Sequence, residues 1–227
     1  MAPPSSPIHT PPARGFARRL ATCLVGLAIF GAGIALIVNS DLGNGPWDVF
    51  HQGLADQLGI GIGVVIIGVG FALVLLWIPL HVRPGLGTLL NAVVVGVVVD
   101  LVLPILPDTD RLVPRICSLA AGIVMMGAGT GMYLGANLGP GPRDGLMTGL
   151  AARGWQVRIA RTAIEVAALG LGVLLGGTIG VGTAIFALTI GPLVQFFIPR
   201  IADPGSPTAS DSGYETPPLD VSPCSGS

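Results

Sequence analysis

Charged side chains are scarce in this sequence, and lysine is absent altogether. Only 10% of the 227 residues are charged, whereas a typical soluble domain carries about 25%, so the composition excludes a soluble globular protein. All eleven basic residues are arginines, and they form no basic patch. A nucleic-acid-binding surface needs such a patch, so nucleic acid is not an expected partner.

Residues that mark metal sites and enzymes are equally few. The three cysteines, Cys23, Cys117 and Cys224, show none of the spacings of a metal site, and the three histidines form no cluster. The sequence contains no P-loop, no dinucleotide fingerprint and no Ser/His/Asp set with usable spacing. We therefore expect no metal, no cofactor and no enzyme activity.

The apolar content is correspondingly high. Hydrophobic residues make up 51% of the chain and the mean hydropathy is +0.79, values typical of an integral membrane protein. Each of six apolar runs is close to the ~20 residues that cross a bilayer as a helix. We therefore predict an all-α polytopic protein of the cell membrane, embedded in the lipid bilayer. The six predicted spans are residues 20–38, 60–80, 86–106, 116–136, 159–175 and 179–198.

The chain contains two copies of one motif, LGxGPxD. Residues 42–55 recur 96 positions later as residues 138–151, with eight of fourteen positions identical, and the later stretches that begin at Gly85 and Gly180 match with an offset of 95. Duplicated halves are a known construction of membrane transporters. The repeated motif residues are Gly43, Gly45, Pro46 and Asp48 in the first copy and Gly139, Gly141, Pro142 and Asp144 in the second.

The two copies are predicted to lie in the membrane in opposite orientations. Each copy contains three spans, an odd number, so the second copy enters from the other side and the fold is a 3+3 inverted repeat. Nine arginines fall on one predicted face and only Arg111 and Arg115 on the other, which places both termini in the cytoplasm. The first repeat then covers residues 16–106, an external linker 107–115, and the second repeat 116–200.

Both ends of the chain are predicted to be disordered. The cytoplasmic N-terminal tail, residues 1–15, is rich in proline and serine. The C-terminal tail, residues 201–227, is also rich in these residues and contains four acidic residues and no basic one. Neither tail can bury enough apolar area to offset the entropy of ordering the chain. The C-terminal tail is either an uninformative extension or a docking site.

Each motif predicts the start of a short helix, because proline suits the first helical position. Pro46 and Pro142 are expected to begin helices at about 46–57 and 142–152, and these helices are either interfacial or re-entrant. The aspartate two residues after each proline has two interpretations. It is either a helix-start carboxylate that satisfies backbone N–H groups, or one of a symmetric pair that lines a substrate or proton path.

Polar residues inside the predicted spans are the candidate lining of a substrate or ion path, because an ionisable side chain at membrane depth usually faces a partner or water. Arg161 and Glu165 lie four residues apart and are the expected ion pair. At an offset of 96 the first copy has Val65 and Val69 in their places. The alternative role of this pair is a structural clamp. The five candidates are Asn91, Asp100, Arg161, Glu165 and Gln195.

Asp100 matches Gln195 at an offset of 95, so both copies have a polar residue at this place. This match predicts a polar layer shared by the two halves. Coupling of transport to protons through Asp100 or Glu165 is a further possibility that this layout allows, because both are carboxylic acids within predicted spans.

Glycines recur at every fourth position in the second half of the chain. Such faces let helices pack closely. They are either internal seams, which we favour because six thin spans must pack against one another, or the face of a homodimer. The glycines are Gly127, Gly131 and Gly135 in one series and Gly172, Gly176 and Gly180 in the other.

Several segments agree in order with one family. They are residues 42–55, RPGLGTLLNA at 83–92, LGPGPRDGLMTGL at 138–150, RTAIE at 161–165 and GTAIFALTIGPLVQ at 182–195. Together they resemble the bacterial YczE/YyaS/YitT group of integral membrane proteins, over about residues 16–200. The resemblance implies a multi-spanning inner-membrane protein. It implies no biochemical activity and no functional residues.

Two functions are carried forward from the sequence. The first is a small-solute transporter or exporter, with its path between the halves and alternating access by rocking of one half against the other. The second is a non-transporting membrane scaffold that binds another protein or supports its assembly. Changes to Asp100 or Glu165 are expected to abolish activity in the first case and to be mild in the second, where loss of a tail is harmful.

Overall fold

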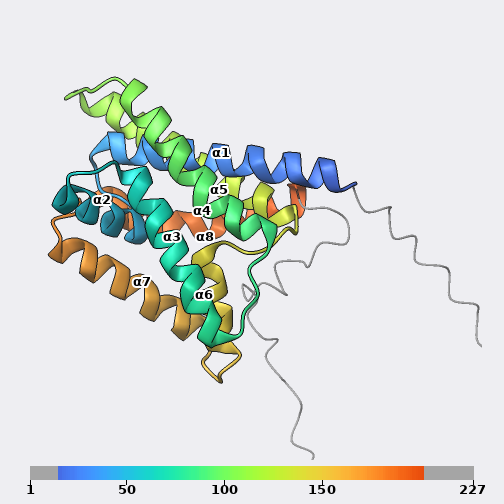
Figure 1. Cartoon of the computed structure of the whole chain (residues 1–227). Helices are drawn as coiled ribbons and strands as arrows, with labels where there is room; N and C mark the ends of the chain where they lie inside the picture. The colour runs from blue at the N-terminus through green and yellow to red at the C-terminus, as the bar shows by residue number, and fades with distance from the viewer. Residues whose placement is uncertain (1–14, 202–227) are drawn as a thin grey trace, which may run out of the picture.

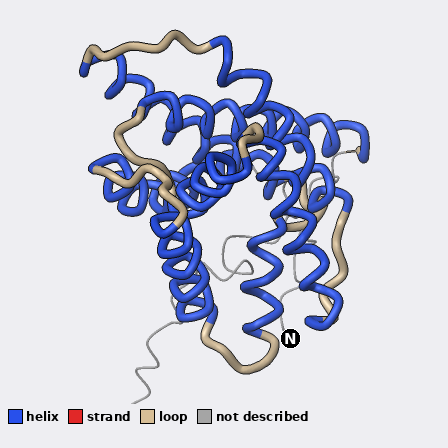
Figure 2. Tube along the Cα trace, turned by 60° about the vertical axis from the view of Figure 1, so that its left-hand side comes forward, coloured by secondary structure: helices blue, strands red, loops and turns tan. Residues whose placement is uncertain are grey.

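The computed structural model describes residues 15–201, and every regular element in that range is a helix (Figures 1 and 2). The all-helical prediction is therefore confirmed. The predictions for the two tails lie outside the described residues, apart from Gly15 and Ile201. The helices are α1 (Phe16–Ser40), α2 (Pro46–Leu58), α3 (Ile62–Leu80), α4 (Leu86–Val102), η1 (Leu103–Ile105), α5 (Leu112–Gly135), α6 (Pro142–Ala151), α7 (Val157–Leu174) and α8 (Val181–Ile201).

Five of the described helices are long and apolar enough to cross a membrane, namely α1, α3, α4 continued by η1, α5 and α8. They match five of the six predicted spans. A helix, α7, also forms where the remaining span was expected, but it is not among the five. Its 18 residues include three charged ones, Arg158, Arg161 and Glu165, whereas none of the five apolar helices contains more than two.

The two motif helices begin where the sequence predicts, α2 at Pro46 and α6 at Pro142. The first glycine of each motif has a positive φ, 112° at Gly43 and 125° at Gly139, which glycine adopts without strain. Each glycine also lies against another backbone. A Cβ atom at Gly139 would be 2.9 Å from the Cα of Gly85, so both conformation and close approach require glycine there.

Each motif loop is held by the last helix of the other copy. The Gly87 amide, in the first turn of α4, donates a hydrogen bond of 2.7 Å to the Leu138 carbonyl. The Gly182 amide, in the first turn of α8, donates one of 2.8 Å to the Leu42 carbonyl. Because 138 − 42 = 96 and 182 − 87 = 95, the two contacts join equivalent residues of the repeats.

The most extensive contact between the copies joins α1 and α5, which run antiparallel and touch through glycines (Figure 1). A Cβ atom at Gly129 would lie 2.6 Å from the Gly26 carbonyl oxygen, and one at Gly122 would lie 2.7 Å from the Gly33 carbonyl oxygen. Gly122 and Gly129 follow Gly26 and Gly33 by 96 positions. The two backbones are therefore in direct contact at two repeat-related crossings.

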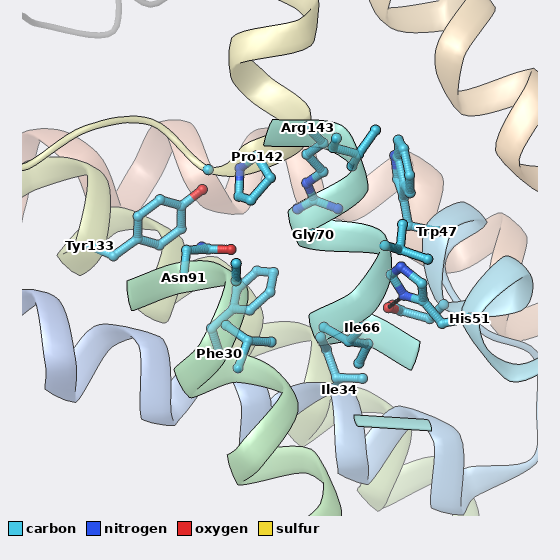
Figure 3. A pocket seen from close by; sticks show the side chains of 16 residues that line it. Phe30, Ile34, Trp47, His51, Ile66, Gly70, Asn91, Tyr133, Pro142 and Arg143 are labelled. Carbon is cyan, nitrogen blue, oxygen red and sulfur yellow. Dashed lines mark ion pairs between the residues drawn. The ribbon is translucent and has the colours of Figure 1, made fainter. Parts of the chain in front are cut away.

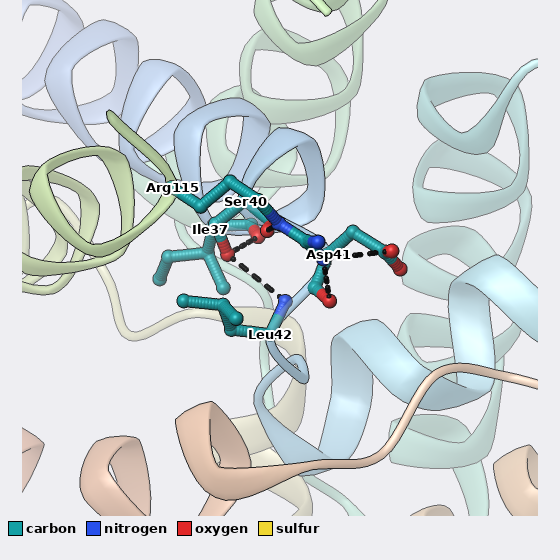
Figure 4. Close-up of polar contacts among 5 residues, drawn as sticks. All are labelled: Ile37, Ser40, Asp41, Leu42 and Arg115. Carbon is teal, nitrogen blue, oxygen red and sulfur yellow. Dashed lines mark hydrogen bonds and ion pairs between the residues drawn. The ribbon is translucent and has the colours of Figure 1, made fainter. Parts of the chain in front are cut away.

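An arginine near the start of each of these helices caps the end of the other. Arg115 donates from Nε to the Ser40 carbonyl at 2.6 Å, and its Nη2 lies 2.8 Å from a carboxylate oxygen of Asp41 (Figure 4). Arg19, 96 positions before Arg115, donates from Nε to the Ala136 carbonyl at 2.8 Å. A cation at a helix C-terminus satisfies orphan carbonyls and interacts favourably with the helix dipole.

Each short helix packs against a long helix of the other copy, and each of these two contacts contains a glycine. On α6, Gly145 lies against the ring of Trp77 on α3, whose Nε1 donates to the Pro142 carbonyl at 2.9 Å. On α7, a Cβ atom at Gly172 would lie 2.7 Å from the carbonyl carbon of Val49 on α2. Val49 and Gly145 are repeat-related, as are Trp77 and Gly172, so the glycine lies on the short helix in one contact and on the long helix in the other.

The same contacts correct the alignment of α7 with α3. Because Trp77 and Gly172 occupy equivalent places, the offset between these two helices is 172 − 77 = 95. The expected offset of 96 was wrong here, because the one-residue difference between the copies falls before these helices and not after them. The corrected pairs are Arg161 with Ile66 and Glu165 with Gly70, in place of Val65 and Val69.

The glycine series on α5 forms an internal seam. A Cβ atom at Gly127 would lie 2.9 Å from the Cβ of Leu193, and one at Gly131 would lie 2.9 Å from the Cβ of Phe197. Both partners are on α8. The glycines therefore let α8 pack closely on α5, as the seam interpretation expects.

We predict that Gly145→Ala lowers the stability of the folded protein by about 1–3 kcal/mol, because the added methyl group meets the fixed Trp77 ring and overpacks the site. The change is measured as a lower midpoint of thermal unfolding in detergent.

A second prediction concerns Gly145→Val combined with Trp77→Gly. The double change should cost less than the sum of the two single changes, because glycine at position 77 removes the ring that the added valine side chain would meet.

Gly170→Ala is the matched control, since Gly170 lies inside α7 with open space around its Cβ position. Alanine favours a helix over glycine by up to about 1 kcal/mol, so this variant should be as stable as the native protein or slightly more so. Equal unfolding midpoints for Gly145→Ala and Gly170→Ala would contradict the contact with Trp77.

Candidate functional site

A cavity lies between the two copies, at the starts of both motif helices (Figure 3). It has a volume of about 60 Å³, and helices α1 to α6 all contribute to its walls. We call it the first chamber. Because Trp47 and Pro142 both line it, two helices far apart in the sequence begin at one place in the interior. Its polar walls are formed by Trp47, Asp48, His51, Asn91, Tyr133 and Arg143.

Two polar atoms of the first chamber have no hydrogen-bond partner within residues 15–201, namely Nε1 of Trp47 and Nδ1 of His51. Both residues are only 8% exposed. Asp48, which is 4% exposed, has its Oδ1 3.7 Å from the His51 Nδ1, beyond a normal hydrogen bond. Buried polar groups of native proteins are nearly always hydrogen-bonded to protein or water, so these side chains suit a chamber that holds water or a polar ligand.

A second cavity, of about 30 Å³, lies where α5, α6, α7 and α8 meet next to Phe30 of α1. We call it the second chamber. Its position in the second copy is equivalent to the position of the first chamber in the first copy. Asp144 and Arg161 line it, at the positions equivalent to Asp48 and Ile66 of the first chamber. The motif aspartate is thus present in both chambers, whereas an apolar neighbour in one is an arginine in the other.

Three side chains line both chambers, and we call them the partition: Phe30, Tyr133 and Arg143. The guanidinium carbon of Arg143 is 5.7 Å from the centre of the Phe30 ring, within the range of a cation–π interaction. The Phe30 and Tyr133 rings pack edge to face with centres 6.1 Å apart. In Figure 3, Arg143 extends between Trp47 on one side of the cavity and Asn91 on the other.

The two motif aspartates are held differently. Asp144 accepts hydrogen bonds from the Tyr133 hydroxyl at 3.0 Å and from the Gly141 amide at 3.2 Å, so it is a helix-start carboxylate that also lines a chamber. Helix α2 has no side-chain cap. Asp48 instead faces His51 in the first chamber. Asp144 therefore fits the interpretation as a helix-start carboxylate, and each of the two aspartates lies in the wall of a cavity.

Two of the five candidate residues reach a chamber, Asn91 the first and Arg161 the second. The expected ion pair is present, with Arg161 Nε 3.0 Å from Glu165 Oε1. Both of its side chains are about one-third exposed, 33% and 36%, so the pair lies at a partly open face of α7. Among the described residues, no group of three His, Cys, Asp or Glu side chains is placed to hold a metal ion.

The other predicted pair, Asp100 and Gln195, lines neither chamber. Asp100 accepts hydrogen bonds from the amides of Gly63 at 2.8 Å and Val64 at 3.1 Å. It therefore caps the first turn of α3 from the end of α4, and its charge is stabilised by the positive end of the α3 dipole. Gln195 lies on an exposed face of α8, and Arg158 stands on α7 at the place equivalent to Gly63.

Sequence reasoning missed four chamber residues: Trp47, His51, Tyr133 and Arg143. Trp47 and His51 are one helical turn apart with Asp48 on the same face of α2, and this spacing was an available signal. Trp47 and Arg143 stand at equivalent positions of the two copies, and the change from an aromatic to a charged side chain was a second available signal. No sequence signal marked Tyr133, because only the fold of α5 against α6 brings its hydroxyl to Asp144.

Two relatives are similar to the chain over most of its length. An uncharacterized protein of Haemophilus influenzae is 41% identical over 186 residues, which cover 82% of this chain and 85% of that protein. The uncharacterized membrane protein YczE of Bacillus subtilis is 36% identical over 179 residues, which cover 77% and 83%. The YczE name and the apolar helices agree on a membrane protein.

A third relative is the uncharacterized protein YyaS of Bacillus subtilis, 30% identical over 185 residues, which cover 78% of this chain and 90% of that protein. The resemblance to the YczE and YyaS proteins is therefore confirmed. No solved structure matches the chain. The sequence pattern of DUF6198, a family of unknown function, matches residues 17–199, and the chain belongs to this family.

Proposed function

We propose that this protein is a small-solute transporter or exporter, and not an enzyme, with its path through the two chambers. The observation that carries the proposal is the meeting of the two motif-helix starts, at Trp47 and Pro142, in one interior cavity. In secondary transporters, short helices from two repeats begin near the bilayer midplane and their starts surround the substrate. A scaffold that only binds another protein needs no polar cavity at this place.

We infer further that the chain forms a 3+3 inverted repeat with six crossings, both termini in the cytoplasm, and re-entrant α2 and α6. The reciprocal caps of α1 and α5 by Arg115 and Arg19 support opposite orientations of the copies. The many arginines near the predicted inner face support cytoplasmic termini. The re-entrant assignment is supported by Trp47 and Pro142, which lie in the first turns of α2 and α6 and line the same interior cavity.

The sixth crossing in this arrangement is α7. Its 18 residues extend about 27 Å at 1.5 Å per residue, close to the ~30 Å hydrocarbon core. Just before it, Arg153 donates to the Leu80 carbonyl at 3.1 Å, at the end of the molecule where α5 finishes. Just after it, the Thr178 carbonyl accepts from the Asn44 amide at 3.2 Å, where α1 finishes. Long charged side chains near a helix end reach the membrane surface.

The partition supplies the barrier that such a cycle needs. Arg143 belongs to the walls of both chambers, one of which contains Asp48 and the other Asp144. Rocking of one repeat against the other changes which of the two carboxylates is nearer to the guanidinium. One chamber then opens while the other closes, which is alternating access.

The chambers favour a small solute that has both polar atoms and an apolar part, because the wall of the first chamber is largely apolar with a few polar side chains. The first chamber, at about 60 Å³, has room for a few waters at about 10–15 Å³ each, and is smaller than the ~150 Å³ cavity that admits benzene. Its walls combine a carboxylate, an imidazole, an amide and a guanidinium. A solute with both donor and acceptor atoms pairs with such walls better than an apolar one does.

The inverted arrangement predicts opposite exposure of two equivalent loops. In full-length protein with Cys23, Cys117 and Cys224 replaced by serine or alanine, a cysteine at Leu58 should react with an impermeant maleimide added to intact cells. A cysteine at Trp155 should react only after the membrane is opened. Both side chains are more than half exposed, 59% and 51%. Equal reaction of both from outside would rule out the inverted repeat.

Ligand binding in the chambers is tested by thermal unfolding of the purified protein in detergent with a library of small metabolites and ions. A solute that binds only the folded state raises the unfolding midpoint by mass action. We expect a solute whose shift is reduced by Asn91→Ala, because this change removes a polar wall of the first chamber.

Asp100→Ala is the control for that measurement. It should lower the unfolding midpoint without ligand, by the equivalent of about 1 kcal/mol for a lost helix cap, and leave the ligand-induced shift unchanged. Equal losses of the shift in both variants would place the ligand outside the chambers. A library without any hit, in protein that stays folded, would favour the scaffold alternative.

A further inference from the structure

The first chamber contains two ionisable side chains that the fold itself does not use. Asp48 is not a cap of α2, which has no side-chain cap, and Nδ1 of His51 has no hydrogen bond within residues 15–201. The two residues are 4% and 8% exposed. Burial of such groups costs free energy unless a partner or a bound species compensates, and ionisable residues at membrane depth usually serve a path for ions or protons.

We propose that Asp48 and His51 together bind a proton, and that this proton is coupled to movement of the solute. The coupling rests on the proposed transport function, whereas the binding does not. The lone pair of a His51 ring nitrogen takes a proton from a hydronium ion in the chamber and leaves a water molecule. With both ring nitrogens protonated, Nδ1–H points a positive charge at the Asp48 carboxylate, and the pair changes from a net charge of −1 to 0.

The chamber has the room and the donor that this step requires. A water molecule needs a cavity of about 10–15 Å³ and two to four polar partners, and the first chamber has about 60 Å³. The indole N–H of Trp47 has no partner within the described chain and is a donor only. Since Asp48 and His51 are 3.7 Å apart, a water bonded to both and to Trp47 connects the pair to the chamber.

Few other charges act on this pair. The walls contributed by α1, α3 and α4 contain no ionisable side chain, and α7 adds none to this chamber. Tyr133 from α5 and Arg143 from α6 are the other ionisable wall residues. Asp144 and Arg161 line the second chamber. Asp48, His51 and Arg143 together therefore change from a net charge of 0 to +1 when one proton binds.

This charge change acts on the partition. Before protonation, Arg143 has a carboxylate in each of the two chambers that it lines, Asp48 and Asp144. After protonation, the positive imidazole balances Asp48. In the second chamber Arg161 is paired with Glu165, so the Asp144 carboxylate still attracts the guanidinium. Proton binding in the first chamber thus favours the arrangement in which Arg143 lies toward Asp144. This links the proton to the opening of one chamber and the closing of the other.

The test is a pH titration of tryptophan fluorescence in the full-length protein in detergent, with circular dichroism as a check on folding. A protonated imidazole quenches a neighbouring indole, and the His51 and Trp47 ring centres are 6.1 Å apart. We expect reversible quenching on acidification that is lost in His51→Gln. The control is His81→Asn, because His81 is exposed and has a positive φ of 56° that asparagine tolerates. This control should retain the quenching.

Asp48→Asn tests the pairing itself. Loss of the carboxylate removes a charge that favours the imidazolium, so the midpoint of quenching should move to lower pH. Absence of pH-dependent quenching in the native protein while it remains folded would overturn the proposal, and needs no variant. Quenching that is unchanged in His51→Gln, or a midpoint that Asp48→Asn does not move, would overturn it as well.

The result of the pH titration can be distinguished from the result of the ligand screen that tests transport. Quenching that depends on His51 and Asp48, together with a failed ligand screen, leaves a proton site in a protein that does not transport. A ligand that depends on Asn91, together with no quenching, leaves a transporter that is not coupled to protons through this pair. The titration uses the protein alone, so neither result depends on knowing the solute.

Discussion

Direct contact between the backbones of α1 and α5 is the constraint on which the rest of the structure depends. Lipid is as apolar as a leucine side chain, so helices in a bilayer associate through close packing and not through burial from water. Gly26 and Gly33 meet Gly129 and Gly122 across this contact. Helix α4 packs on α1 and α8 packs on α5, so a wider separation here would displace both outer helices and the chambers beside them.

The two copies share a scaffold and differ in the walls of their chambers. The caps by Arg19 and Arg115, and the amides of Gly87 and Gly182, bond to repeat-related carbonyls. Within that common scaffold, Ile66 on one side stands where Arg161 stands on the other. Symmetric architecture therefore supports an asymmetric distribution of charge between the two chambers.

Much of the fold was predictable from the sequence, because apolar runs and the LGxGPxD motif act locally. Helix starts at Pro46 and Pro142 follow from the conformation of proline and the residues next to it. The contacts that define the chambers were less accessible. Asp100 reads as a buried charge in a span, and only the packing of α4 against α3 shows that it caps Gly63 and Val64. The sequence alone does not show that the start of α3 lies beside the Asp100 carboxylate of α4.

The interlocking of Trp77 with Gly145, and of Gly172 with Val49, has a consequence for the history of the gene. A repeated gene can exchange sequence between its halves. Here, copying the first half over the second would place valine at Gly145 against the Trp77 ring and tryptophan at Gly172 against the backbone of α2. The reverse copy would replace Trp77 by glycine and leave a gap beside Gly145. Either product would fold poorly. These contacts thus oppose homogenisation of the two halves, and allow each half to evolve its own chamber.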